Sequence, residues 1–147
     1  MGRSYVDYRG SGFWTRDVQA EVYLCLLSAA AGEVAGPPRW LRGAREDWRL
    51  QATAGFMGCV SPGLDEHVGV EPERVDLVLE LSERVRNRLV AWGPAIPKDL
   101  VSALGTGGGQ DVFDDDLDTG PFLRFADAFA GLLRGEFPVG PGTTTVY

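Results

Sequence analysis

The stretch "PERVDLVLELSERVRNRLVAWGP", residues 72–94, decides the fold class of this chain. One of its faces recurs at three- and four-residue spacing, the period of an amphipathic helix, and consists of Val75, Val78, Leu79, Ser82, Val85, Leu89 and Trp92. Pro72 suits a first helical turn, because the amide N–H that proline lacks has no partner there. Gly93 and Pro94 end the pattern. The stretch therefore predicts a helix over residues 72–92.

The same spacing predicts further helices on both sides of this one. They are residues 14–31, the segment from Pro37 to Cys59, a short helix over residues 97–104, and the segment from Pro121 to Gly135. Thr15 is the expected N-cap of the first of them, because its hydroxyl can accept from an unpaired amide of the first turn. The segments 60–70 and 105–110 are expected to be connectors.

These elements predict a mainly α fold, a compact bundle of four to five helices with short connections. The bundle is expected to form a single domain over residues 1–147, with an N-terminal arm at residues 1–13 and a non-helical tail at residues 136–147. Tyr5–Tyr8 and Thr143–Tyr147 are rich in β-forming residues. We therefore expect a minor two-stranded element made by the termini, within one chain or between two.

The charge and the apolar runs of the chain exclude several classes of protein. The 147 residues carry a formal net charge of −7, and nucleic-acid affinity depends largely on positive charge that neutralises phosphates. Nucleic-acid binding is therefore not expected. No apolar run approaches the roughly 18 residues of a membrane span, and no secretory signal is visible, so we expect a cytoplasmic protein. One lysine against 13 arginines is typical of a GC-rich bacterial genome.

No catalytic or cofactor signature stands out. Cys25 and Cys59 make no disulfide framework, and both are expected on buried helix faces, where thiols behave as small hydrophobes. His67 is the sole imidazole and is expected at the surface or at a helix end. Zinc spacings, the E-x-x-H pair of di-iron bundles, the P-loop ending and the G-x-S-x-G elbow do not occur. The sequence therefore predicts no metal and no cofactor, and it argues against an enzyme.

The segment "DVFDDDLDTGP", residues 111–121, holds five aspartates within residues 111–118. Asp114, Asp116 and Asp118 have the spacing of calcium ligands, but an EF-hand then needs glycine at its sixth and glutamate at its twelfth position. Thr119 and Phe125 stand there instead. We interpret the segment as a solvated turn in which Asp118 or Thr119 caps the following helix. Cation binding by residues 111–118 is the weaker alternative.

Polar residues at the edges of the first two helices have two interpretations. They are Asp17, Glu21, Arg45 and Asp47, with Trp48 beside them. In the first interpretation Arg45 pairs with Glu21 or Asp17 between the helices, which satisfies the buried charges. In the second, the five residues line a carboxylate and arginine pocket, with Trp48 as its apolar wall and His67 nearby. The pocket would bind or hydrolyse a small molecule.

The N-terminal segment "YVDYRGSGFW", residues 5–14, is dense in aromatic residues and arginine. Tyrosine, tryptophan and arginine are the residues that most often dominate binding energy at protein interfaces. The segment either covers its own bundle or contacts a partner. Its candidate interface residues are Tyr5, Tyr8, Arg9, Phe13 and Trp14.

Together these observations predict a non-catalytic interaction protein as the leading function. It would bind a protein partner or a second copy of itself by burying Tyr8, Phe13 and Trp14, with acidic groups steering association. A small, acidic, helical chain of this kind is similar in type to bacterial immunity and antitoxin proteins, although no motif carries that similarity. The alternative is the small-molecule pocket between the first two helices.

Overall fold

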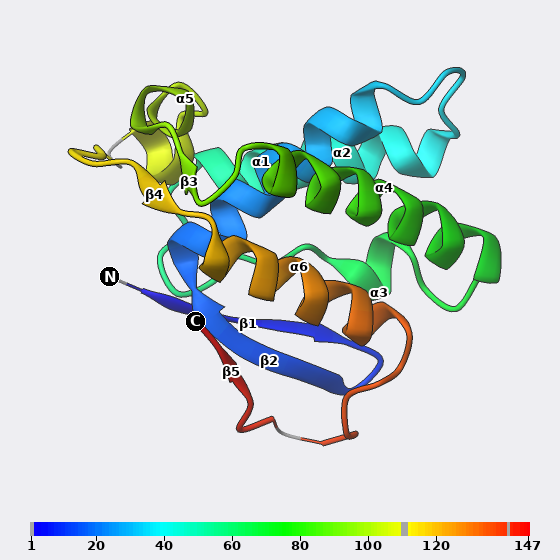
Figure 1. Ribbon diagram of the computed structural model, residues 1–147. Helices are drawn as coiled ribbons and strands as arrows, with labels where there is room; N and C mark the ends of the chain where they lie inside the picture. Colours follow the sequence, from blue (N-terminus) through cyan, green and yellow to red (C-terminus); the bar gives the residue numbers. More distant parts are fainter. Residues whose placement is uncertain (1, 110–111, 141) are drawn as a thin grey trace.

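The computed structural model describes residues 2–109, 112–140 and 142–147, and six α-helices occur in this part of the chain (Figure 1). They are α1 (Asp17–Gly32), α2 (Arg39–Thr53), α3 (Leu64–His67), α4 (Pro72–Ala91), α5 (Lys98–Ser102) and α6 (Gly120–Leu133). The structure is mainly α, with 55% of it helical. It is not a purely helical bundle, because two small sheets accompany the helices.

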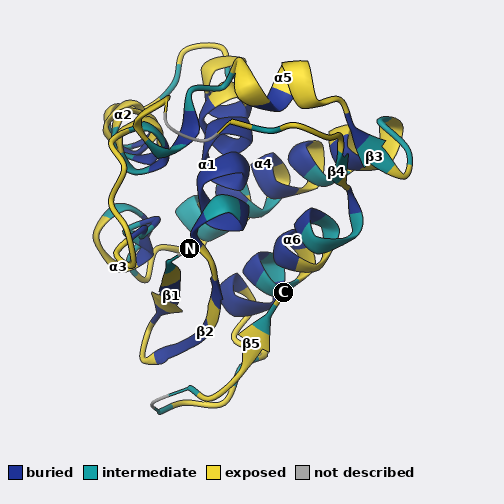
Figure 2. Ribbon diagram, turned by 90° about the vertical axis from the view of Figure 1, so that its left-hand side faces the viewer, coloured by how far each residue is buried: buried dark blue, intermediate teal, exposed yellow. Residues whose placement is uncertain are grey.

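Helix α1 is the centre of the core. Its sequence, "DVQAEVYLCLLSAAAG", is apolar around nearly its whole circumference, and a helix of that kind needs neighbours on all sides. The structure buries 13 of its 16 residues. Figure 2 shows α1 in the buried colour along its length, with α2 on one side and α4 and α6 on the other. The other helices are amphipathic and present their apolar faces to it.

The N-terminal residues form a β-hairpin against the core. Strands β1 (Arg3–Tyr8) and β2 (Ser11–Arg16) are antiparallel, and the turn between them places Arg9 at φ 51° and Gly10 at φ 79°. Two positive φ values are typical of a type I′ turn, whose twist matches that of the strands it joins. Residues 1–13 were expected to be an arm, and that prediction is wrong for the described residues. They lie under α6 as part of the fold (Figure 1).

The pairing predicted for the two termini is also wrong in its partners. Tyr5–Tyr8 pairs with β2, and the C-terminal strand β5 (Thr145–Val146) lies parallel to β2 on its other side. The paired residues are Trp14 with Thr145 and Thr15 with Val146. The described part of the tail at residues 136–147 contains no helix.

Helix α1 starts at Asp17, three residues later than Trp14. Trp14, Thr15 and Arg16 continue β2, and Thr15 is buried opposite Ser4 in the sheet. Thr15 is therefore not an N-cap. The predicted start was wrong because the apolar spacing of α1 continues into the preceding residues. Pairing with β1 holds those residues in extended form.

Helix α2 ends at Thr53, six residues before Cys59. Gly55 follows at φ 76°, a left-handed conformation that glycine adopts without strain. Cys59 is consequently exposed in a loop, so its predicted place on a buried helix face is wrong. The expected connector at residues 60–70 contains the one-turn helix α3.

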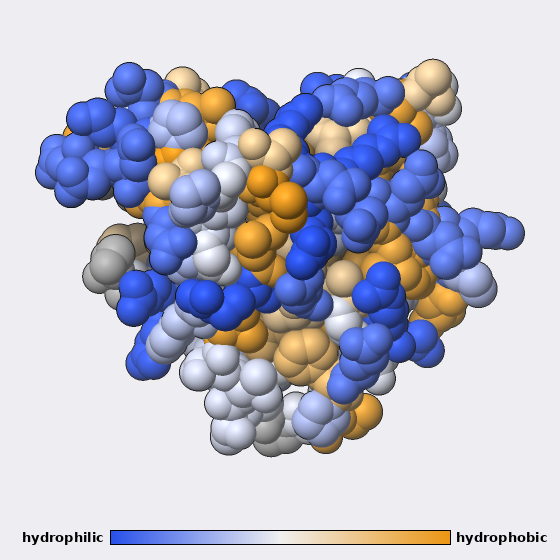
Figure 3. All heavy atoms as spheres, viewed as in Figure 1, coloured by the Kyte–Doolittle hydropathy of each residue, from blue (hydrophilic) through white to orange (hydrophobic). Residues whose placement is uncertain are grey.

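Helices α4 and α6 lie beside each other and close the opposite side of the core. The boundaries of α4 agree with those predicted within a residue, and the short predicted helix appears as α5. Strands β3 (Ala95–Ile96) and β4 (Leu117–Asp118) pair antiparallel and were not expected. Figure 3 shows hydrophilic side chains over α4 and the segment near α5, with smaller hydrophobic patches between them.

Candidate functional site

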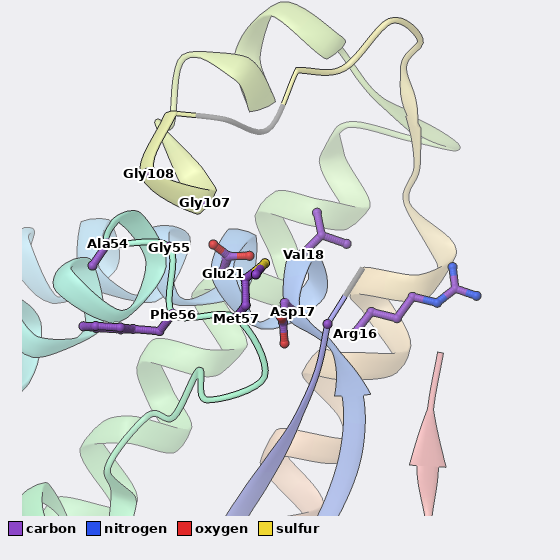
Figure 4. A pocket seen from close by; sticks show the side chains of 11 residues that line it. Arg16, Asp17, Val18, Glu21, Ala54, Gly55, Phe56, Met57, Gly107 and Gly108 are labelled. Carbon is purple, nitrogen blue, oxygen red and sulfur yellow. The ribbon is translucent and has the colours of Figure 1, made fainter.

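A cavity of about 460 Å³ opens where the N-terminal end of α1 meets the end of α2 and a glycine turn (Figure 4). The glycine turn is residues 106–109, with Gly107 at φ 62° and Gly108 at φ 72°. The cavity is lined by Gly2, Arg16, Asp17, Val18, Glu21, Ala54, Gly55, Phe56, Met57, Gly107 and Gly108. Its walls thus combine backbone, apolar side chains and two carboxylates from one helix.

The two carboxylates of α1 have opposite orientations. Figure 4 shows the Glu21 carboxylate directed toward Gly107 and the Asp17 carboxylate directed away from it. Glu21 is only 5% exposed although it lines the cavity. Buried polar groups need partners, and Glu21 has an interaction of its own within the protein. Among the residues of the first interpretation, Glu21 is the one directed into this cavity.

Asp17 has a structural set of partners. Its Oδ1 accepts a hydrogen bond from the Ser4 hydroxyl at 2.6 Å, and its Oδ2 accepts from the Gly58 backbone amide at 2.9 Å. Its own amide donates to the Gly2 carbonyl at 3.1 Å. The side chain therefore fastens β1 and the loop after α2 to the start of α1.

Arg45 does not pair with Asp17 or Glu21, which corrects the first interpretation. Its guanidinium lies over Gly32, where an added Cβ would come within 2.8 Å of it, and its carbonyl accepts from Ser28. Gly32 is 11 residues beyond Glu21, which corresponds to about 16 Å along a helix. The register of α1 against α2 thus places Arg45 at the far end of α1.

Asp47 and Trp48 lie at a third place, near α3. Asp47 Oδ2 is 2.7 Å from His67 Nε2. His67 is the last residue of α3, which agrees with the expected helix end, and it is partly buried against α2. Trp48 is fully buried, and its indole N–H donates to the Pro62 carbonyl at 2.8 Å. The five residues therefore do not form the composite pocket of the second interpretation.

The Asp47–His67 pair resembles two members of a catalytic triad but has no nucleophile. Within the described residues, no hydroxyl or thiol group forms a hydrogen bond with His67. Burial raises the pKa of the Cys25 thiol to about 11, so this thiol is protonated near neutral pH and is a poor nucleophile. The pair links α2 to α3.

The aromatic residues of the hairpin divide between the two faces of the sheet. Tyr8 and Phe13 point inward, at 3% and 0% exposure, and Phe13 packs edge-on against Phe125 at 5.6 Å between ring centroids. They are buried in their own chain, which corrects their place among the interface candidates. Arg9 is at the hairpin tip, where its amide donates to Asp65 at 2.9 Å.

Tyr5 and Trp14 point outward and are direct cross-strand partners. Their rings are 5.2 Å apart, and Trp14 is 39% exposed. Tyr147 completes the surface: the Arg16 guanidinium lies 5.1 Å from its ring centroid, and the Arg3 guanidinium donates to its hydroxyl at 2.9 Å. We call this surface, made of Arg3, Tyr5, Trp14, Arg16 and Tyr147, the outer sheet face.

A cleft of about 670 Å³ adjoins the outer sheet face through Arg16 and Tyr147. Its remaining walls are Val18, Gln19, Val112, Phe113, Leu117, Asp118, Pro121, Phe122 and Arg124. Arg124 donates to the backbone carbonyl of Tyr147 at 2.6 Å. Sequence reasoning missed Arg124 and Tyr147, because only the pairing of β5 with β2 brings Tyr147 next to Arg16.

The acidic segment has a structural role in its described residues, which exclude Asp111. Asp116 accepts from the Lys98 backbone amide at 2.9 Å, and the Lys98 ammonium donates to the Asp114 carbonyl at 3.1 Å. Asp118 accepts from the Gly120 amide at 3.0 Å, but the N-cap of α6 is Thr119 and no side chain caps the helix, so the capping interpretation is wrong. In the described residues no cluster of His, Cys, Asp and Glu is suited to holding a metal ion.

The helices in the described part of the chain are all too short or too polar to cross a membrane. Comparison of the chain with protein-family models, with curated proteins and with solved structures found no match. The geometry of the chain itself is therefore the basis for the function proposed below.

Proposed function

We propose that this protein acts by binding a protein partner through the outer sheet face. The observation that carries the proposal is the grouping of Tyr5, Trp14 and Tyr147 with arginines on the solvent side of the sheet. Tryptophan, tyrosine and arginine are the residue types most enriched among the energetic centres of interfaces. The other side of the same sheet is core, so these side chains have a rigid support.

The local charge defines the chemistry of the partner. Arg3, Arg16 and Arg124 lie on or beside the outer sheet face together with Asp7 and Asp118, a local excess of one positive charge, whereas the whole chain has a net charge of −7. An acidic partner would be attracted to this face and repelled by most of the remaining surface, which favours one orientation of encounter. We therefore propose a partner that presents carboxylates around an apolar side chain.

The adjoining cleft suits that apolar side chain. Phe113, Leu117 and Phe122 contribute apolar walls, and Arg16 and Arg124 stand on its rim. A buried anchor surrounded by polar contacts is the usual arrangement of an interface centre. In this proposal Trp14 is the side chain that this protein buries against the partner, and the cleft binds an apolar side chain of the partner.

Replacement of Trp14 by Ala is expected to weaken partner binding by about 30-fold, because truncation of an interface centre costs about 2 kcal/mol or more. Leu50→Ala is the matched control, since Leu50 is 54% exposed on α2. The partner would be captured from source cells, purified, and titrated calorimetrically against the wild type and both variants. Equal affinity for wild type and Trp14→Ala would contradict the proposal.

Light scattering on the same samples distinguishes a second copy from a different partner. A wild-type dimer that Trp14→Ala converts to a folded monomer identifies a second copy as the occupant of the outer sheet face. A substitution is preferable to deletion of residues 1–13, because deletion would remove Val6, Tyr8 and Phe13 from the core.

A second candidate function is binding of a small cationic ligand in the cavity of Figure 4. It rests on the Glu21 carboxylate, which is directed into the cavity beside the apolar side chains of Val18 and Met57. We expect benzylamine to bind there and neutral benzyl alcohol not to, as measured by amide chemical shifts. Glu21→Gln is expected to weaken the amine by about tenfold, and Glu73→Gln, on the exposed start of α4, is the control. Equal shifts with the alcohol would exclude this candidate.

A further inference from the structure

A second cavity, of about 410 Å³, lies at the other end of α1, where α1 ends beside the first half of α2. It is lined by Ala31, Gly32, Val34, Pro37, Leu41, Arg42, Arg45, Glu46 and Arg49. Four of these residues make an apolar wall, and three are arginines of α2. The cavity shares no lining residue with the cavity of Figure 4 or with the cleft beside the outer sheet face.

Arg42, Arg45 and Arg49 follow one another at spacings of three and four residues, so they lie along one side of α2. In the described residues none of the three forms a salt bridge, whereas Arg74, Arg84, Arg86 and Arg88 each do. The chain has 21 acidic residues against 14 basic ones. The three arginines bring positive charge to one side of α2, and Glu46 is the acidic residue of the same cavity wall.

The end of α1 accounts for part of this arrangement. No basic residue occupies its last turn, and a helix C-terminus carries roughly half a negative elementary charge. The guanidinium of Arg45, which lies over Gly32, offsets that charge. Three arginines and Glu46 bring a net charge of +2 to the cavity wall, from three positive charges and one negative. The partial negative charge at the C-terminus of α1 therefore compensates only a small part of the positive charge on the cavity wall.

The start of α2 adds to the positive potential. Its N-cap is Pro38, which forms no side-chain hydrogen bond, and its first turn contains no acidic residue. A helix N-terminus favours a negative group nearby, and arginine there is unfavourable. The chain instead has Arg39 and Arg42 in that region, which costs helix stability. A bound anion would relieve this repulsion.

We infer that this cavity binds a small organic oxyanion, a phosphate or a carboxylate that carries an apolar group. Guanidinium groups hold such anions through paired N–H donors of fixed geometry. The oxyanion would lie between Arg42, Arg45 and Arg49, and the apolar group would pack on the wall made by Val34, Pro37 and Leu41. The inference is independent of the outer sheet face.

The test is a titration of the full chain at low salt, followed by amide chemical shifts and calorimetry. The probes are phenyl phosphate and benzoate, with phenol as the uncharged match and inorganic phosphate as the match without an apolar group. We expect both aromatic anions to shift amides around Gly32 and along α2, and the tighter one identifies the headgroup. We expect phenol not to bind there, and inorganic phosphate to bind more weakly than phenyl phosphate.

Substitutions then locate the site. Arg45→Gln and Arg42→Gln are each expected to weaken the tighter anion by about tenfold, and Glu46→Gln is expected to strengthen it. Arg84→Gln is the matched control, because it removes the same charge from an exposed position of α4 outside the cavity. Arg42→Gln keeps the test valid if Arg45→Gln loosens the contact with Gly32. Absence of binding at millimolar probe, or an equal loss in Arg84→Gln, would overturn the inference.

Discussion

Trp48→Ala is expected to lower the free energy of unfolding by about 3–5 kcal/mol, the range for truncation of a buried aromatic residue. Trp48 is fully buried on α2, and its indole N–H donates to the Pro62 carbonyl at 2.8 Å. The substitution leaves a cavity in the core beside His67 and a buried Pro62 carbonyl without its donor. Guanidinium unfolding followed by far-UV circular dichroism measures the change.

Two further variants separate packing from hydrogen bonding at Trp48. Trp48→Phe keeps a ring in the site but removes the N–H donor, and it is expected to cost about 1–3 kcal/mol. Leu50→Ala, at a 54% exposed position of the same helix, is expected to change stability by about 0.5 kcal/mol at most. If Trp48→Ala were no more destabilising than Leu50→Ala, the core position of Trp48 would be wrong.

Asp17→Ala is expected to lower the free energy of unfolding by about 2–4 kcal/mol, because hydrogen bonds to a charged acceptor contribute about 1.5–3 kcal/mol each. The loss would leave the Ser4 hydroxyl and the Gly58 amide without their acceptor. The same serine accepts from the Val60 amide at 2.8 Å, so the effect extends to the loop after α2. Urea unfolding gives the value, and Asp76→Ala on exposed α4 is the control.

A double-mutant cycle of Asp17→Ala with Ser4→Ala tests the network itself. The two residues hydrogen-bond directly, so the two changes are expected to be less than additive by about 1 kcal/mol or more. Additive effects would show that the Ser4–Asp17 contact contributes little in solution. A change in Asp17→Ala no larger than that in Asp76→Ala would show that its buried hydrogen bonds do not stabilise the fold.

These two residues show why the pocket expected from sequence does not form. Trp48 and Asp17 look like an apolar wall and a carboxylate of one site when only helix faces are considered. In the structure each side chain instead forms a hydrogen bond with a loop. Trp48 donates to the Pro62 carbonyl, and Asp17 accepts from the Gly58 amide. Glu21 and Arg45 remain at the edges of two separate cavities, at opposite ends of α1.

Local patterns in the sequence predicted the five longer helices, although they missed α3, the start of α1 and the end of α2. The face of α4 repeats over twenty residues between a proline and a glycine, and such periodicity reflects contacts between chain neighbours alone. The apolar circumference of α1 likewise predicts burial. In residues 11–16 the three- and four-residue spacing of a helix overlaps with the two-residue alternation of a strand. The sequence therefore fits both structures, and only pairing with another strand selects the extended form.

Tertiary structure decided everything that depends on register. The position of α2 along α1 decides whether Arg45 lies beside Glu21 or beside Gly32. A displacement of one helical turn is about 5.4 Å, which is enough to change the residue that Arg45 contacts. His67 reaches Asp47 only through the fold of the loop that carries α3. Tyr147 reaches Arg16 only because β5 pairs with β2. The sequence alone determined where the longer helices lie and which of their faces are apolar, since these follow from spacing. Long-range packing determined which charged and aromatic side chains contact each other. The energy of such a contact depends on the distance between the two groups, which their spacing along the sequence does not define.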